Sequence, residues 1–354
     1  MYTLGIDLHK RMSMWVVIDE TLQVVWSATV KCHPDYVTAA LRKIEGQDIP
    51  LQGMPAALEP VCGWRWVATQ LEGAGMDIHI ANPAKVRIIA ESAQKTDFND
   101  ARFLAELLAK RYLPESYRLS EEVYELREII RYRRFLVEQR TSVKNRIHGV
   151  AVAHGMHLLY GKNPLRKSGM KLIRGNHPEL EDMLAFIEKH EVHIAPLELA
   201  IASRARKSAQ AKLLMTMPGV GPITALTVLA EVGDFTRFGH PRKLCMFAGL
   251  VPSTRNSAGK VRHGRITKAG SPHLRSILVE AAMRIRAPSA PQLASFYERI
   301  KQKKSARVAR VALARKMLVI MWHMITQGKP YLPQPIASPH SNTRRDELVC
   351  PHGA

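Results

Sequence analysis

The chain has 354 residues, enough for about two domains of ordinary size and a connector. Lysine and arginine outnumber aspartate and glutamate by 52 to 31, and the resulting net charge of +21 favours a polyanionic partner, of which nucleic acid is the commonest. No apolar run approaches the ~20 residues of a membrane span and no secretory signal stands at the N-terminus, so we expect a cytoplasmic protein without a membrane partner. The four cysteines lack Cys-x-x-Cys spacing, which argues against a zinc ribbon and a disulfide framework.

The first part of the chain alternates between strand and helix patterns. Three β-rich runs with short polar connections predict an antiparallel meander over Tyr2–Asp7, Met14–Ile18 and Val24–Val30. Helix and strand patterns then alternate over Pro34–Glu45, Ala56–Glu59, Cys62–Leu71 and Asp77–Ile80, and Pro83 opens a further helix. The order βββαβαβα is that of an α/β ribonuclease H-like domain, which collects distant acids at one end of a mixed sheet.

Four acids occur where this order would bring them together. They are Asp7 in the first strand, Glu59 at the end of the fourth strand, and Asp97 and Asp100 at the start of a helix expected to begin near Phe98. Considered alone, Asp97 and Asp100 are better explained by N-capping and the helix dipole, with Asp97 as the N-cap. Four converging carboxylates, however, repel one another unless divalent cations neutralise them, and hard oxygen ligands suit Mg²⁺ or Mn²⁺. Two such ions can stabilise the attacking and leaving oxygens of a phosphodiester.

Other candidate ligands have simpler interpretations. Asp19 lies in an expected hairpin turn and Asp77 at a strand start, where solvated acids are ordinary. The histidines show no ligand spacing, so we interpret them as residues that bind no metal.

A connector follows the α/β region. Helical spacing of apolar residues extends from Glu121 to Gly155 and again from about Glu179 to Met215, which predicts an antiparallel, partly coiled-coil hairpin of helices. Basic residues concentrate in Arg131–Arg134 and Lys144–Arg146. They indicate either an arm for dimerisation and nucleic-acid binding or a pair of packed core helices with solvated charges, and the pattern does not separate the two.

A glycine turn opens the C-terminal region. In Met217-Pro-Gly219-Val-Gly221-Pro, small residues precede an apolar helix, as in a helix-hairpin-helix element whose backbone N–H groups approach a phosphate. The simpler alternative is a tight helix-helix turn in which glycine supplies a positive φ. No Walker-type Gly-Lys-Ser/Thr loop occurs, so ATP-driven chemistry is not expected.

Ser257 lies in a flexible, cation-rich segment. Between Arg237 and Lys329 the only acids are Glu280 and Glu298. A serine hydroxyl in such surroundings could attack a phosphodiester, because cations stabilise the charge on the pentacovalent phosphorus. Composition alone still favours an incidental serine in a basic loop. The basic residues near Ser257 that we expect to contact nucleic acid are Arg255, Lys260, Arg262, Arg265 and Lys268.

These motifs together resemble one family. Gly-Ile-Asp7, Leu-Glu59-Pro and Lys-Thr-Asp97-Phe-Asn-Asp100-Ala are similar to the RuvC-like DEDD domain of insertion-sequence transposases of the IS110/IS1111 family, relatives of Piv-type invertases. Gly-Leu-Val-Pro, Asn-Ser257-Ala-Gly-Lys and Gly-Arg-Ile-Thr-Lys-Ala-Gly resemble its C-terminal domain, which carries a nucleophilic serine. The resemblance implies Ser257 as nucleophile, with Ser253 as the fallback, although Ala258 stands where many members have glycine.

The resemblance also implies partners and a domain division. It implies Mg²⁺ (or Mn²⁺) on the four acids, donor and target DNA, a structured guide RNA, and a homo-oligomer, dimer or tetramer, in which one protomer's acids meet another's serine. The expected regions are a RuvC-like domain over 1–115, a helical connector over 116–212, a mainly α transposase domain over 213–329 and a flexible tail over 330–354.

The expected activity is therefore that of a DNA recombinase that excises and inserts a mobile element. Two alternatives remain: a Mg²⁺-dependent Holliday-junction nuclease that uses the acids and water alone, and a non-catalytic nucleic-acid-binding protein whose acids merely cap helices. The sequence specifies neither the DNA target, nor the guide RNA, nor the oligomer size.

Overall fold

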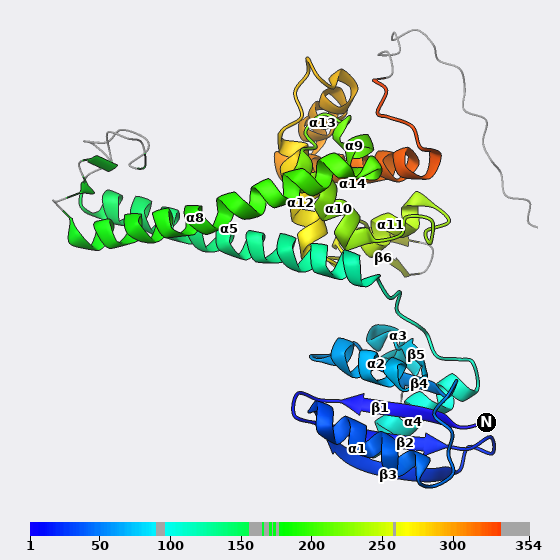
Figure 1. Ribbon diagram of the computed structural model, residues 1–354. Helices are drawn as coiled ribbons and strands as arrows, with labels where there is room; N and C mark the ends of the chain where they lie inside the picture. The colour runs from blue at the N-terminus through cyan, green and yellow to red at the C-terminus, as the bar shows by residue number, and fades with distance from the viewer. Residues whose placement is uncertain are drawn as a thin grey trace, which may run out of the picture. The chain divides into compact units, whose positions relative to one another are not determined.

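The structure, a computed structural model, describes residues 1–89, 96–155, 165, 170–171, 173–174, 177–257 and 260–333, with only the backbone at 255–257 and 260–263. The chain forms two compact units, Met1–Arg118 and Leu119–Ala354 (Figure 1). Most of the predicted tail, from residue 334 onward, lies outside the described residues, as does Lys95 of the Lys-Thr-Asp motif.

The first unit is built on a mixed five-stranded sheet. Its strands are β1 (Thr3–Leu8), β2 (Met12–Ile18), β3 (Val24–Lys31), β4 (Pro55–Leu58) and β5 (Asp77–Ile80), in the spatial order β3-β2-β1-β4-β5. β1, β2 and β3 form the predicted antiparallel meander, whereas β4 runs parallel to β1 and β5 parallel to β4. The predicted order of strands and helices is confirmed, and β1 lies at the centre of the sheet.

Helices cover both faces of this sheet. On one face, α1 (Pro34–Glu45) and α2 (Trp64–Gly73) share a core with alternate residues of β1, including Leu4 and Ile6. On the other face lies α4 (Asp97–Ala109), which follows the short helix α3 (Pro83–Ile89). Because side chains alternate along a strand, Gly5 and Asp7 belong to the face that α4 covers.

Gly5 is what allows α4 to lie this close to the sheet. A Cβ atom at Gly5 would stand 2.0 Å from the carbonyl oxygen of Ala101 and 2.7 Å from the backbone nitrogen of Ala105. Ala101 and Ala105 are themselves fully buried, so small residues line both sides of the contact. The helix backbone therefore packs directly on the strand backbone, and the first turn of α4 is brought towards the end of β1.

The start of α4 differs by one residue from the prediction. Thr96 is the N-cap, and its side chain accepts a hydrogen bond from the Asn99 N–H at 3.2 Å. Asp97 is the first helical residue and not the cap. Threonine is a sufficient cap by itself, and the Asp97 carboxylate is thus available for other contacts.

The second unit begins with two long helices. α5 (Glu121–Ala153) and α8 (Pro178–Lys207) lie side by side in Figure 1 and form the predicted antiparallel hairpin. Near one end Ile130 and Ile201 enter the same core, and near the other Ile147 packs with Leu184. α8 continues through Pro196 without ending.

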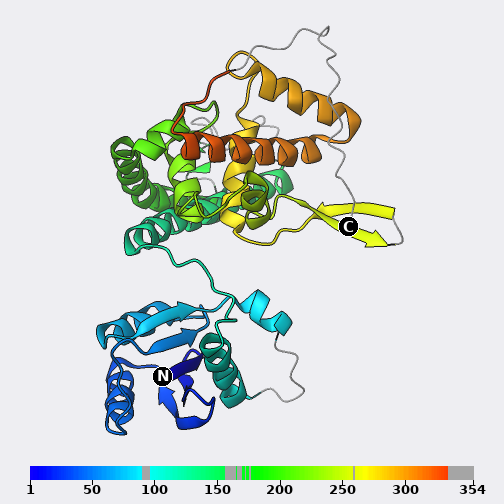
Figure 2. The same ribbon diagram turned by 90° about the vertical axis from the view of Figure 1, so that its right-hand side faces the viewer.

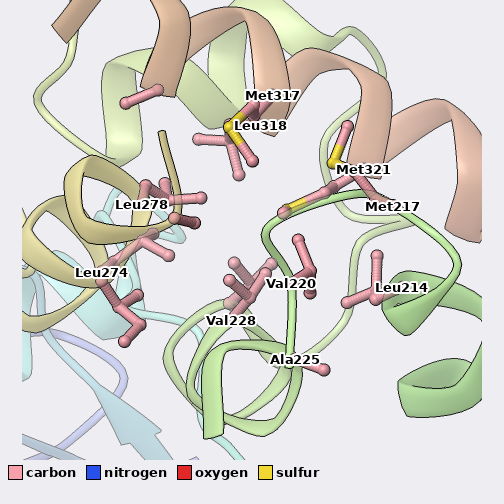
Figure 3. Close-up of a cluster of buried hydrophobic side chains, with 14 of the residues drawn as sticks. Leu214, Met217, Val220, Ala225, Val228, Leu274, Leu278, Met317, Leu318 and Met321 are labelled. Atoms are coloured by element: carbon pink, nitrogen blue, oxygen red, sulfur yellow. The ribbon is translucent and has the colours of Figure 1, made fainter. Parts of the chain in front are cut away.

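The rest of this unit is mainly helical. It contains α9 (Ala209–Met215), α10 (Pro222–Val232), α11 (Pro241–Phe247), α12 (Pro272–Met283), α13 (Pro291–Lys303) and α14 (Ala306–Gln327). Figure 3 shows the centre of its core, where Val228 of α10, Leu278 of α12 and Met321 of α14 converge around the turn at Met217–Val220. α10 is buried on every side: nine of its residues are buried, and three of these, Thr224, Thr227 and Glu231, are polar.

The segment around Ser257, expected to be flexible, has a regular backbone. β6 (Pro252–Ser257) and β7 (Lys260–Ile266) form an antiparallel ladder that pairs Ser257 with Lys260 and Arg255 with Arg262. Figure 2 shows this hairpin projecting from the helices of its unit. A hairpin stands where composition favoured a basic loop, because an exposed antiparallel ladder needs no alternation of apolar residues to form.

Candidate active site

Two predicted acids and one histidine converge at the end of β1 and the start of α4. One ligand atom from each of Asp7, His9 and Asp97 lies within 4.8 Å of the other two. The Nε2 atom of His9 is 3.2 Å from Oδ2 of Asp7 and 3.4 Å from Oδ1 of Asp97. Asp7 is mostly buried, with 16% of its side chain exposed, whereas His9 and Asp97 are 54% and 67% exposed. The cluster thus has a buried base and an open side.

The register of the sheet brings Glu59 to the same edge. β1 and β4 are parallel and pair Ile6 with Leu58, so Asp7 and Glu59 each stand one residue beyond the last paired positions of the two strands. Glu59 is partly buried and directly follows β4. Residues that directly follow paired positions in two parallel neighbouring strands are adjacent. Because side chains alternate along each strand, Asp7 and Glu59 both belong to the face of the sheet that α4 covers.

Asp100 follows from helical geometry. It stands three residues after Asp97 and one before Ala101, the residue in contact with Gly5. Residues three apart on a helix share a face, so Asp100 belongs to the side of α4 nearest the sheet, and its side chain is partly buried. All four predicted acids thus belong to the first unit, but among the described residues the group of ligand atoms within 4.8 Å of one another includes only two of them, Asp7 and Asp97; Glu59 and Asp100 lie outside that group.

Of the competing explanation, N-capping does not account for Asp97, whereas Asp97 and Asp100 both lie in the first turn of α4, where they complement the helix dipole. Thr96 already caps α4, as described above.

The two other acids considered earlier do have local roles. Asp19 accepts hydrogen bonds from the N–H and hydroxyl of Thr21 and from the N–H of Gln23, which lower its pKa. Asp77 contacts Nε2 of His79 at 3.1 Å.

His9 was not predicted as part of the site. The signal was present: His9 is two residues after Asp7, and positions two apart along an extended chain lie on the same side. Its proximity to Asp97 could not have been found from sequence, because it depends on how α4 docks.

The donor set at this cluster fits a divalent cation. Two carboxylates supply negative charge and oxygen ligands, the imidazole supplies a further donor, and the spacing matches groups that share one ion. Mg²⁺ or Mn²⁺ would be held by Asp7 and Asp97, with Glu59 and Asp100 as the remaining carboxylates of the predicted set.

The predicted nucleophile belongs to the second unit. Ser257 is the last residue of β6, and only its backbone is described. By strand alternation, positions 255 and 257 share a face of the ladder with their partners 262 and 260. Ser253 lies at the irregular start of β6 and is exposed. Its hydroxyl oxygen is close to Gly264, since a Cβ added at Gly264 would stand only 2.5 Å from it. Downstream of the hairpin, Lys268 has a φ of 55°.

The two glycines of the turn before α10 have different surroundings. Gly219 has a φ of +80°, and a Cβ there would lie 2.7 Å from the carbonyl oxygen of Ala281. Turn geometry and close packing therefore explain the glycine at this position. Gly221, the N-cap of α10, has an ordinary φ of −100°, and a Cβ added there would have no described atom within 4 Å. Close packing therefore explains the glycine at position 219 but not the glycine at position 221.

The basic residues of α5 are largely engaged within their own unit. Arg133 pairs with Glu198, Arg140 with Glu191, and Arg134 with Glu138 and Ser276. These contacts support the interpretation of α5 and α8 as packed helices, and they leave fewer cations available for nucleic acid than the sequence suggested.

The most buried of these contacts centres on Glu231 at the end of α10. Its side chain is 2% exposed and binds Arg131 through two hydrogen bonds of 2.9 and 3.0 Å and Ser271 through one of 2.8 Å. Burial raises the pKa of Glu231, but the hydrogen bonds from Arg131 and Ser271 outweigh it and leave that pKa below its ordinary value. Arg127 also donates to the Ala230 carbonyl. This network joins α5, α10 and the segment that follows β7.

Within the described part of the chain, no helix combines the length and the apolar character needed to cross a membrane.

Comparisons with known proteins identify transposase profiles in two parts of the chain. The DEDD transposase profile of the IS110 group matches residues 4–154, which include all four acids, and the profile of the transposase IS116/IS110/IS902 family matches residues 211–298, which include Ser257. The chain is 26% identical over 348 residues to a probable family 20 transposase of Pseudomonas aeruginosa, covering 93% of this chain and 98% of that protein.

Two further relatives extend the comparison. The transposase for insertion sequence element IS1111A of Coxiella burnetii is 26% identical over 344 residues, covering 93% of this chain and 90% of that protein. The pilin gene-inverting protein of Moraxella bovis is 32% identical over 124 residues, or 34% of this chain and 38% of its own length. The protein is therefore a DNA recombinase of the transposase class. It belongs to the IS110/IS1111 family of insertion-sequence transposases.

Proposed function

We propose that the protein excises and inserts a mobile element by Mg²⁺-dependent serine attack on DNA phosphodiesters. The observation that carries this proposal is the convergence of Asp7 and Asp97, which are 90 residues apart in the sequence, at one end of the sheet. The strand order β3-β2-β1-β4-β5, with acids after the central strands, supports a ribonuclease H-like fold for the first unit.

In this proposal the acids would hold a divalent ion, which would supply positive charge next to the phosphate. Asp7, Glu59, Asp97 and Asp100 are the residues that would hold Mg²⁺, which supplies electrostatic stabilisation of the reacting phosphodiester when bound. The partly buried position of Asp7 favours this role, because charge interactions strengthen where water is excluded. The open side of the cluster, formed by His9 and Asp97, gives the DNA backbone access.

Ser257 supplies the nucleophile. Its oxygen forms a bond to phosphorus, the bond from phosphorus to one deoxyribose oxygen breaks, and that oxygen takes up the proton that the serine loses. A hydroxyl of another DNA end reverses the step, so phosphodiester energy is conserved and no nucleotide is hydrolysed. Neighbouring ladder positions are basic, with Lys260 opposite Ser257 and Arg262 opposite Arg255. Cations there would stabilise the developing negative charge.

Contacts to the nucleic-acid backbone complete the proposal. Arg265 of β7 and Lys268, which follows β7, are exposed, and the Gly219–Gly221 turn precedes α10, where backbone N–H groups could approach a phosphate. A structured RNA that pairs with donor and target DNA would provide sequence selection. The protein would act as a homo-oligomer, dimer or tetramer, because acids and serine lie in separate units and can come from different protomers.

The test is to trap the covalent intermediate. The full chain would be expressed with its coding region and native flanking DNA, and DNA-linked protein would be isolated after denaturation and digested for mass spectrometry. We expect a nucleotide on Ser257, an adduct that requires Mg²⁺, and its loss in Ser257→Ala and in Asp7→Asn but not in Ser253→Ala. RNA that copurifies would be sequenced from the same preparation.

Each alternative predicts a different result. An adduct lost only in Ser253→Ala would move the nucleophile to Ser253. Mg²⁺-dependent cleavage unaffected by either serine variant would support the nuclease and refute the covalent mechanism. Binding without cleavage under every condition, unchanged by Asp7→Asn, would support the non-catalytic alternative.

A further inference from the structure

His9 contacts two acids in a way that differs from ordinary histidine hydrogen bonding. A single nitrogen, Nε2, is 3.2 Å from a carboxylate oxygen of Asp7 and 3.4 Å from one of Asp97. A ring nitrogen offers either one N–H or one lone pair, so it cannot make two well-aligned hydrogen bonds at once.

His79, in the same unit, shows the ordinary arrangement. Its two ring nitrogens point to different carboxylates, with Nδ1 at 2.9 Å from Glu115 and Nε2 at 3.1 Å from Asp77. Each acid is contacted by a different ring nitrogen, and among the described residues these three groups do not form a set of ligand atoms within 4.8 Å of one another. In the His9 cluster, by contrast, one potential ligand atom from each of the three residues lies close to the same point.

The dimensions of the His9 cluster match those of a coordination sphere. For ligands about 2.1 Å from an octahedral ion, adjacent ligand atoms are about 3.0 Å apart and opposite ones about 4.2 Å apart. The two separations from His9 Nε2, 3.2 and 3.4 Å, are close to the first value, and the limit of 4.8 Å on all three pairs accommodates either value for the two acids.

We propose that His9 is a ligand of the divalent ion held by Asp7 and Asp97, and that this nitrogen makes the site prefer Mn²⁺ over Mg²⁺. The inference rests on the proposed metal site and adds to it a donor that the four carboxylates do not include. Mg²⁺ is a hard cation that takes oxygen ligands and keeps its waters, whereas first-row transition ions accept imidazole nitrogen. One nitrogen among oxygens therefore shifts affinity towards Mn²⁺ without excluding Mg²⁺.

The exposure of His9 is compatible with this role. The side chain is 54% exposed, so the imidazole can adjust by a few tenths of an ångström when an ion binds, and its replacement removes contacts only with Asp7 and the exposed Asp97. A variant at this position is expected to fold, which makes the metal site testable by itself.

The experiment is pulsed electron paramagnetic resonance of Mn²⁺ bound to the full chain, combined with calorimetric titrations of Mn²⁺ and of Mg²⁺. Wild type is expected to show nitrogen coupling from a coordinated imidazole. His9→Ala should lose that coupling and bind Mn²⁺ on the order of 10-fold more weakly, with a smaller change for Mg²⁺. His9→Gln, which restores an oxygen donor, should also lack the coupling and should bind Mg²⁺ as wild type does.

Two controls separate failure of this inference from failure of the proposed function. His79→Ala removes a histidine that bridges two acids elsewhere in the unit and should leave nitrogen coupling and both affinities unchanged. Asp7→Asn should abolish tight binding of either ion. If Mn²⁺ binding depends on Asp7 but shows no nitrogen coupling, the assignment of His9 is overturned and the acidic site is left intact. The same follows if Mn²⁺ binds more tightly to His9→Ala than to wild type. Absence of Mn²⁺ binding, or binding indifferent to Asp7→Asn, would overturn both.

Discussion

Gly5→Ala should separate the two halves of the acidic site without altering any acid. The added Cβ would stand 2.0 Å from the Ala101 carbonyl oxygen, and an ordinary contact begins near 3.4 Å, so the backbone of α4 must move by about 1.4 Å or β1 must deform. The atom in the way is backbone and cannot rotate aside. We expect a loss of about 1–3 kcal/mol in the free energy of unfolding, as for other overpacked cores.

The same displacement should impair function more than stability. Metal ligation tolerates deviations of about 0.2 Å, and a misplacement of about 1 Å at a reacting centre can cost about 100-fold in rate. The assays are urea unfolding, Mn²⁺ titration and formation of the DNA adduct. Gly73→Ala is the matched control, because Gly73 is a helical residue of the same unit with no atom within 4 Å of its added Cβ. Wild-type stability together with wild-type metal binding in Gly5→Ala would refute the claim that this close approach positions Asp97.

Three further predictions concern the second unit. Glu231→Ala should lower the free energy of unfolding by about 1.5–3 kcal/mol because it removes the hydrogen bonds of a buried carboxylate with Arg131 and Ser271. Glu138→Ala breaks an exposed pair and should cost less than about 0.5 kcal/mol, and equal effects in urea unfolding would contradict the role of burial. Since the folded pKa of Glu231 lies below its ordinary value of 4.5, its contribution to stability is complete above that pH and is lost as the pH falls through the folded pKa. Wild type should therefore lose more stability than Glu231→Gln as the pH is lowered below 4.5. Gly219→Ala should destabilise the chain by about 1–3 kcal/mol through its positive φ and its contact with backbone. Gly221→Ala should cost less stability, because only the weaker N-cap of alanine opposes it, and should weaken DNA binding; unchanged DNA affinity in Gly221→Ala would remove this turn from the nucleic-acid interface.

The candidate site shows where sequence patterns stop being informative. Short apolar runs and breakers predicted the strands and helices of the first unit in their order, and acids at strand ends followed from that order. The patterns could not show that Thr96 caps α4 in place of Asp97, because both residues are good caps and one position separates them. Nor could they show that Arg131 is bound to Glu231, since a charged residue on a helix looks the same in sequence whether its partner is water or a carboxylate 100 residues away.

What the sequence determined by itself is local: the succession of elements, the basic character of the chain, and the motifs around Asp7, Asp97 and Ser257. Only the tertiary structure brings a ring nitrogen of His9 close to carboxylate oxygens of Asp7 and Asp97. The physical reason is that local patterns depend on residues within a turn or two, whereas this convergence depends on β1 lying at the centre of the sheet and on α4 touching it at Gly5.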